Sequence, residues 1–420
     1  MRASWVVAVS ALPALCALAS CGKTIDSIGS NGVADGHLNR VTGPATYQNP
    51  FKELGKTDAE IAVKLADTFQ KLFYGDPNTQ AIYVPMGTDQ AYILDTLHGD
   101  KRTEGIGLAM MICIQLDKRA EFDRLWTYAD TQMKHKDPPR RGYFESRCDT
   151  LTATTMACDD PYGEQQMVTA LIFAHFRWGS TTGPVDYETG ALALLDVMRH
   201  KEDENGGIVD GITNTFDSTT ALPYHLPVQA SPVVGRPSIV MPAYYDLWAQ
   251  ATGDPFWTSA AVAARSYWAK SAHPMTGLMP VRATLSDGKP DSYWDMFDSE
   301  AYRAHVNMAL DWAWAKGEKD AWEVTEANNL LAFFTGKGMA TYGSAYSIDG
   351  TEVIDSLRDF ALIAVNGTTA MVATNVGKDA YVNAVWEMST QTGLARYYSG
   401  ILHLTALLIL SGQYIVWGGG

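Results

Sequence analysis

Cysteine and the short motifs of several enzyme classes are scarce in this 420-residue chain. Only five cysteines occur, and neither a C-x-x-C pair nor an H-E-x-x-H motif is present, so a structural or catalytic zinc site has no support. A G-x-S-x-G elbow is missing, and no glycine-rich phosphate loop follows a strand pattern. The sequence therefore gives no indication of a serine hydrolase or of a nucleotide-binding fold.

Positive charge is also low, with 32 Lys and Arg against 47 Asp and Glu and a net charge of −15. An acidic chain is repelled by nucleic acid and by anionic lipid, so we expect neither as a partner. Apolar residues make up 46% of the chain, which is enough for a large core and excludes wholesale disorder. Tryptophan and tyrosine are abundant, at 12 and 20 residues. Such rings often stack on sugars, although most pack in cores.

The first twenty residues are predicted to be a leader. Arg2 precedes an apolar run over residues 5–18, which is shorter than the roughly 20 residues of a membrane-spanning helix and is typical of an export signal. The Leu-Ala-Ser-Cys tetrapeptide ending at Cys21 resembles a bacterial lipobox, which implies cleavage before Cys21 and attachment of lipid to it. We therefore expect an exported protein anchored in the bacterial envelope; the alternatives are an ordinary signal peptide or a buried helix. Residues 21–45 are rich in Gly, Ser, Asn and Asp and are predicted to form a flexible tether.

The remaining cysteines have separate interpretations. Cys16 leaves with the leader, and Cys113 lies in an apolar helical run, where it is expected to be inert core. Cys148 and Cys158 could form a disulfide in an oxidising periplasm.

From Asp58 onward the pattern predicts about twelve helices. Met167, Ala170, Leu171 and Ala174, for example, follow the i, i+3, i+4, i+7 spacing of one helix face. No linker divides residues 46–420, so we predict one catalytic domain, either a closed toroid of six helical hairpins or a solenoid. The absence of a fixed-period repeat disfavours the solenoid. The predicted helices span residues 58–74, 104–117, 119–133, 164–178, 187–199, 238–252, 255–271, 300–316, 319–335, 356–373, 378–390 and 396–412.

Carboxylates stand where two of these apolar helices begin. Thr103 is a plausible N-cap, which places Glu104 in a first turn, and Gly105 and Gly107 permit close approach of backbone or ligand. The simpler interpretation of Glu104 is a first-turn charge favoured by the helix dipole. In the segment from Asp298 to Arg303, carboxylates again stand at the junction of a loop and an apolar helix.

Glu300 and Arg303 are spaced as an i, i+3 ion pair, which is the simpler interpretation there too. If carboxylates from two such distant segments met in one cleft, they would form the pattern of glycoside hydrolysis. A third acidic segment, from Asp160 to Glu164, predicts a turn followed by a helix and by itself needs no function.

Taken together, these segments resemble glycoside hydrolase family 8, most closely its reducing-end xylose-releasing exo-oligoxylanases. The resemblance covers residues 49–417. It is carried most specifically by Arg102-Thr103-Glu104-Gly105 and Arg396-Tyr397-Tyr398, in that order, and Tyr302-Arg303 lies among the further matching segments.

The resemblance implies an all-α (α/α)₆ barrel and inverting hydrolysis of β-1,4-linked oligosaccharides, with release of xylose from the reducing end of xylo-oligosaccharides. It implies two carboxylates and neither metal nor cofactor, and we expect a monomer. Glu104 matches the general acid, whose pKa must be raised by burial against the effect of a helix N-terminus. Glu300 matches the general base, with Asp298 as its rival.

Three positions depart from the family pattern. Glu300 stands where relatives have Asp, and Tyr162 stands where they have an Asp that binds the central sugar; Asp160 could substitute for the latter. Arg358 stands where the oligoxylanase type has a loop His. These departures keep two alternatives open: the same barrel with a shifted glucan or xylan substrate, and a non-catalytic sugar-binding lipoprotein.

The remaining predicted binding residues are one cation and four rings. Arg303 could orient the base or balance its charge. The rings could stack on sugars or simply pack in the core. They are Trp126, Tyr302, Tyr397 and Tyr398.

Overall fold

The structure is a computed structural model. The leader, Cys21 and Cys158 lie outside the residues that it describes, so the lipid anchor and the Cys148–Cys158 pair stay predictions. Cys113 is buried, as expected. The described residues are 36–44, 46–149, 160–181, 183–230, 232–315 and 320–418.

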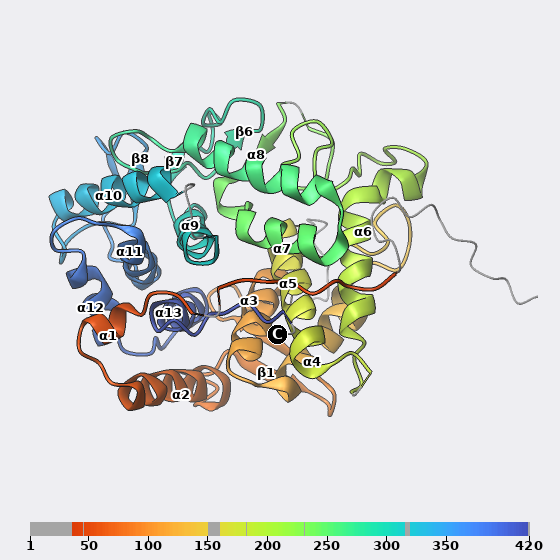
Figure 1. Ribbon diagram of the computed structural model, residues 1–420, viewed down its shortest axis with the longest axis horizontal. Helices are drawn as coiled ribbons and strands as arrows, with labels where there is room; N and C mark the ends of the chain where they lie inside the picture. The colour runs from red at the N-terminus through yellow and green to blue at the C-terminus, as the bar shows by residue number, and fades with distance from the viewer. Residues whose placement is uncertain are drawn as a thin grey trace, which may run out of the picture.

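Six inner helices form a closed ring. Each packs against the next in chain order, and the last, α13, packs against the first, α3. Figure 1 looks down this ring. An inner helix has neighbours on all sides, which explains why every residue of α3 except Glu104 is buried. The inner helices are α3 (Thr103–Gln115), α5 (Pro161–Trp178), α7 (Pro242–Thr252), α9 (Arg303–Trp314), α11 (Phe360–Val372) and α13 (Arg396–Leu410).

A second layer of helices surrounds the ring. These helices are amphipathic: in α2, Ile61, Leu65, Phe69 and Leu72 are buried on one face, and a Thr57 capping box starts the helix. The two layers confirm the predicted (α/α)₆ barrel. The outer helices are α2 (Asp58–Tyr74), α4 (Arg119–Tyr128), α6 (Tyr187–Asn205), α8 (Pro255–Ser271), α10 (Asp320–Lys337) and α12 (Asp379–Glu387); the short helices are α1 (Pro50–Glu53), the π-helix η1 (Ala129–Met133) and the 3₁₀ helix η2 (Pro237–Ile239).

The predicted boundaries are confirmed for α2 and α8. Other helices begin later than predicted, because their predicted first residues belong to the preceding loop. α7 begins at Pro242 rather than at residue 238, because proline is favoured at the first helical position. α9 begins at Arg303 rather than at residue 300. Asp298 and Glu300 therefore belong to the turn before α9 and not to the helix.

Short strands, which the periodicity did not predict, lead into inner helices. β3 runs directly into α3, and β5, β7 and β9 precede α7, α9 and α11. Most of these strands have only two to four residues, which is too short for an alternating pattern to be recognised. β2 is the exception, because its six residues alternate between buried and partly buried. The sheets have the antiparallel orders β1-β2-β3-β4, β5-β6 and β7-β8-β9. The strands are β1 (Tyr83–Met86), β2 (Gln90–Asp95), β3 (Asp100–Arg102), β4 (Arg147–Asp149), β5 (Val234–Gly235), β6 (Ala283–Thr284), β7 (Met296–Phe297), β8 (Ala345–Ser347) and β9 (Val353–Asp355).

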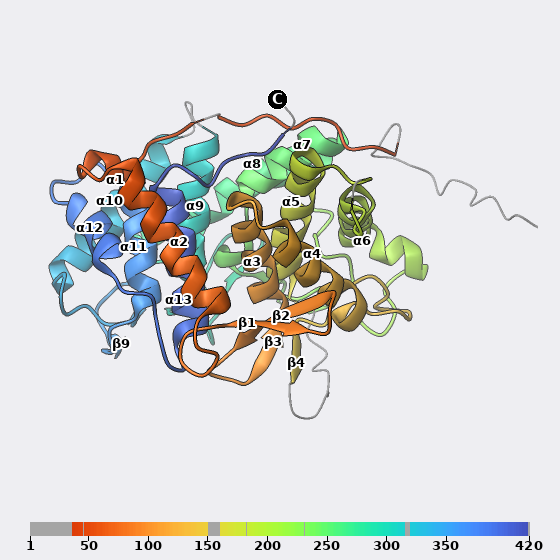
Figure 2. The ribbon, with the colours of Figure 1, turned by 90° about the horizontal axis from the view of Figure 1, so that it is seen from below.

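The end of the barrel opposite the four-stranded sheet is covered by the two ends of the described chain (Figure 2). Residues 36–44, which we assigned to the tether, lie against α6 and α7: Leu38 N–H donates to Glu188, and Asn39 N–H donates to the carbonyl of Ala251. The Gln115 side chain at the end of α3 donates to the carbonyl of Ile415. Within the described residues, no helix combines the length and the apolar character needed to cross a membrane.

Candidate active site

Glu104 owes its position to the junction of β3 and α3. Arg102 has extended backbone and is the N-cap, while the N–H of Thr103 donates to the carbonyl of Ser146, just before the neighbouring strand β4. The helix thus begins at Thr103, and the prediction that Thr103 is the N-cap is wrong by one residue, because strand pairing extends to Arg102. Glu104 remains in the first turn, at the strand-rich end of the barrel.

Glycines let neighbouring helices approach the first turn of α3. A Cβ on Gly163 of α5 would lie 2.5 Å from the carbonyl oxygen of Thr103 and 2.6 Å from the nitrogen of Glu104. A Cβ on Gly107 would lie 2.6 Å from the carbonyl oxygen of Gly163. A Cβ on Gly105 would lie 2.7 Å from the ring of Tyr397. The close approach expected of Gly105 and Gly107 is therefore approach by protein.

The carboxylate of Glu104 has two protein partners. It accepts a hydrogen bond from the Tyr397 hydroxyl at 3.0 Å and forms an ion pair with the Arg303 guanidinium. Burial raises the pKa of Glu104; Arg303 opposes this effect, and the negative charge of Glu300 adds to it. The direction matches a carboxyl group that keeps its proton until it is needed.

Arg303 joins the two predicted catalytic carboxylates. One terminal nitrogen pairs with Glu104, and the other lies 3.5 Å from Glu300. Its side chain is 1% exposed, and its guanidinium lies 4.4 Å from the centre of the Tyr162 ring. Two carboxylates from segments nearly 200 residues apart thus face the same buried cation.

The two acidic residues in the turn before α9 differ in exposure and in hydrogen bonding. Glu300 is 47% exposed and turns its carboxylate toward Arg303 and Arg236. Asp298 accepts the N–H of Glu300 at 2.8 Å and so holds the turn. Burial, together with the charge of Glu300, raises the pKa of Asp298. The Tyr398 hydroxyl fixes the same turn by donating to the Ser299 carbonyl at 2.6 Å.

Arg236 is a site residue that the sequence did not indicate. It follows β5, is almost completely buried, and contacts both Asp160 and Glu300, the latter at 3.6 Å. Asp160 is the N-cap of α5 and accepts the N–H of Tyr162. Burial raises the pKa of Asp160, but Arg236 outweighs this effect and holds the pKa below its ordinary value. No motif surrounds Arg236, and only strand pairing brings it here.

The predicted sugar-stacking rings are mostly packed. Trp126 is buried, and its ring would lie 3.0 Å from a Cβ on Gly190, so it packs in the core between outer helices. Tyr302 is fully buried and donates to the Ser344 carbonyl. Tyr162 is buried beneath Arg303 and accepts from Gln166. Among the four predicted rings, Tyr397 and Tyr398 remain beside the carboxylates.

Arg358 lies on the exposed loop between β9 and α11. Its guanidinium donates to the Met339 carbonyl at 3.0 Å and lies 5.4 Å from the centre of the Tyr342 ring. It is therefore held against the segment between α10 and β8.

A family model described as "Glycosyl hydrolases family 8" matches residues 92–412, which is most of the chain. The chain belongs to glycosyl hydrolase family 8. It is 35% identical over 381 residues to the reducing-end xylose-releasing exo-oligoxylanase Rex8A of Paenibacillus barcinonensis, covering 89% of this chain and 97% of the relative. A reducing end xylose-releasing exo-oligoxylanase of Halalkalibacterium halodurans is also 35% identical, covering 88% of this chain and 94% of the relative.

Solved structures agree with this family 8 assignment. Rex8A of P. barcinonensis complexed with xylose matches with a TM-score of 0.81 and 34% identity, covering 89% of this chain and 98% of that one. A family 8 xylobiose complex from Teredinibacter turnerae matches with a TM-score of 0.82, the same identity and the same coverage. The protein is thus a glycoside hydrolase.

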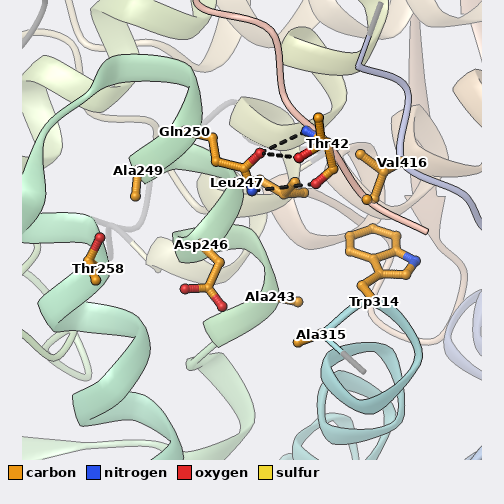
Figure 3. A pocket seen from close by; sticks show the side chains of 11 residues that line it. Thr42, Ala243, Asp246, Leu247, Ala249, Gln250, Thr258, Trp314, Ala315 and Val416 are labelled. Atoms are coloured by element: carbon orange, nitrogen blue, oxygen red, sulfur yellow. Dashed lines mark hydrogen bonds between the residues drawn. The ribbon is translucent and has the colours of Figure 1, made fainter. Parts of the chain in front are cut away.

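A pocket of about 520 Å³ lies away from these carboxylates, at the end of the family 8 barrel where the two terminal segments lie. It is lined by residues of α7, by Thr258 of α8, by the end of α9 and by both terminal segments, and Gln250 there bonds to Thr42 (Figure 3). Its carboxylate, Asp246, pairs with Arg265. We therefore assign the chemistry to the carboxylate pair and not to this pocket. Within the described ranges, no group of three or more His, Cys, Asp or Glu is arranged to hold a metal ion.

Proposed function

We propose that the protein is an inverting glycosidase that releases xylose from the reducing end of β-1,4-linked xylo-oligosaccharides. The observation that carries this proposal is the arrangement of Glu104 and Glu300 on opposite nitrogens of the buried Arg303. A raised pKa on one carboxyl group and an exposed second carboxylate match the two roles that inversion needs. The activity named for both relatives supports the choice of substrate.

In the proposed reaction, Glu104 gives its proton to the glycosidic oxygen as the bond to the leaving xylose breaks. Glu300 removes a proton from a water molecule that attacks the anomeric carbon from the opposite face. Arg303 stays charged throughout and holds both carboxyl groups in place while Glu104 becomes negative and Glu300 becomes neutral. When Glu104 loses its proton, Arg303 and the Tyr397 hydroxyl stabilise the new anion.

Glu300 is preferred to Asp298 as the base because its carboxylate is more exposed and is not used to hold the turn. We expect Glu300→Gln to reduce kcat by roughly 100- to 10,000-fold, the usual contribution of an acid or base. Asp298→Asn keeps an oxygen that can accept the N–H of residue 300, so its loss should be much smaller. The reverse ranking of the two variants would transfer the base to Asp298.

The proposal is tested with xylotriose and anomer-resolved NMR. We expect xylose and xylobiose as products, with inverted configuration at the anomeric carbon of the new reducing end. Glu104→Gln removes the transferable proton but keeps the shape, so it should lose most activity while circular dichroism stays unchanged. Retained configuration, or full activity in Glu104→Gln, would refute the mechanism.

A shifted substrate is the second candidate, and Tyr162 favours it. Its ring lies under Arg303 where relatives have a sugar-binding Asp, while Arg236 presents Asp160 nearby. A panel of xylo-, cello- and arabinose-substituted xylo-oligosaccharides separates the two candidates by kcat/KM. Binding of these sugars in calorimetry without any turnover would instead indicate a sugar-binding protein on an enzyme scaffold.

We further propose export and lipid attachment at Cys21. Residues 36–44, the first that the structure describes, run along the end of the barrel opposite the carboxylates (Figure 2). Their position supports an anchor on that side. Membrane fractionation of cells that express the full chain should find the protein with membranes, and Cys21→Ser should release it. Gel filtration with light scattering of the released domain tests the predicted monomer.

A further inference from the structure

An aromatic pair lies on the loop between β6 and β7 and has no role in the proposed reaction. Tyr293 is 76% exposed, one of the most exposed large side chains among the described residues. Its ring centre lies 5.7 Å from that of Trp294, at an interplanar angle of 65°. Trp294 is partly buried and packs against the core, so it supports the exposed ring of Tyr293 from one side. Exposing a large aromatic surface beside a second ring has a cost in water that a ligand would remove.

The backbone of this loop is held in place. The N–H of Tyr293 donates to the Asp291 side chain at 3.0 Å, and the N–H of Trp294 donates to the Asp291 carbonyl at 3.0 Å. The Arg282 guanidinium lies 5.0 Å from the centre of the Trp294 ring. A loop whose backbone is already held loses less conformational entropy when it binds, which favours a binding role.

Strand pairing connects this loop to the carboxylates. Gly235 of β5 lies opposite Ala283 of β6, so the next antiparallel step sets Arg236 opposite Arg282. The N–H of Arg282 in turn donates to the Trp294 carbonyl at 3.1 Å. Three chain segments thus lie side by side, with Arg236, which contacts Glu300, on one flank and Trp294 on the other.

This register sets the distance. Neighbouring segments in such an arrangement lie roughly 5 Å apart, so the Trp294 backbone is on the order of 10 Å from that of Arg236. A second observation agrees: burial lowers the pKa of His225 to about 3, and both Arg236 and Arg282 add to the effect. His225 therefore lies within electrostatic range of both cations, and its N–H donates to the carbonyl of Val234 in β5.

We infer that Tyr293 and Trp294 form an outer binding subsite that stacks on a neutral sugar ring of a longer oligosaccharide, beyond the rings at the carboxylates. This inference rests on the proposed function, because the sugar chain must pass the carboxylate pair. It assigns the loop a role in selecting chain length. The C–H-rich face of a pyranose suits an aromatic face.

The test compares kcat/KM on xylotriose and on xylohexaose. Replacing both rings, in Tyr293→Ala with Trp294→Ala, should lower kcat/KM on xylohexaose about tenfold, which corresponds to about 1.4 kcal/mol. On xylotriose the same double variant should stay within about twofold of the unsubstituted protein. Tyr293→Phe keeps the ring and serves as the matched control, so it should retain the value on xylohexaose.

The outcomes separate this inference from the proposed function. If the unsubstituted protein hydrolyses neither substrate, the proposed function fails. If it hydrolyses both and the double variant loses equally on both, or loses nothing on xylohexaose, the subsite inference is overturned. Unchanged activity on xylotriose also shows that the variant is folded.

Discussion

The contact between α5 and the start of α3 predicts a large effect from a single methyl group at Gly163. In Gly163→Ala, the new Cβ would lie 2.6 Å from the nitrogen of Glu104 and 2.5 Å from the carbonyl oxygen of Thr103. Both atoms belong to backbone, so no side-chain rotation can relieve the overlap. The nearest atom is the carbonyl carbon of Thr103, at 2.3 Å, so the two helices must separate by about 1.1 Å at this point to reach an ordinary contact of 3.4 Å.

Such overpacking costs about 1–3 kcal/mol of stability. Displacing a catalytic group by about 1 Å can cost 100-fold in rate, so we expect kcat/KM on xylotriose to fall by roughly that factor. Gly336→Ala in α10 is the matched control, because a Cβ there meets nothing within 4 Å and alanine favours the helix. The melting temperature should fall for the first variant only. Activity within threefold of the unsubstituted protein in Gly163→Ala would refute the claim that this contact positions Glu104.

Three further predictions follow from charge and burial. Arg303→Met removes the cation that opposes the raised pKa of Glu104, so the alkaline limb of kcat/KM for its residual activity should move to higher pH; an unmoved limb contradicts this. Burial raises the pKa of Glu326 to about 8 in the folded state, above the ordinary value of 4.5. The protonated group therefore favours the folded state, so its contribution to stability is complete below pH 4.5 and is lost as the pH rises toward 8. Glu326→Gln should therefore flatten the fall in melting temperature between pH 5 and 9, by the equivalent of roughly 4 kcal/mol, and an unchanged slope contradicts the assignment. Trp126→Ala should lower stability by about 3–5 kcal/mol but leave KM on xylotriose unchanged, because the ring packs in the core; a raised KM would return Trp126 to the binding site.

Much of the fold could be predicted because the helices are long and strongly periodic. α2 and α8 begin and end at the predicted residues, since a capping box starts one and a capped proline starts the other. The strands after β2 escaped prediction because two or three residues carry no periodicity, and their pairing is chosen by the barrel around them.

What the sequence determined by itself is local: a carboxylate at the start of the apolar α3, an acidic turn before α9, and an arginine one turn later. Closing the ring of inner helices brought Glu104 to Arg303, a contact across 199 positions that no spacing rule contains. Tertiary structure alone made Arg236 a site residue and Trp126 a core residue, since strand pairing and burial decide both. It also set the direction of the Glu104 pKa, because burial in the folded barrel outweighs the nearby cation.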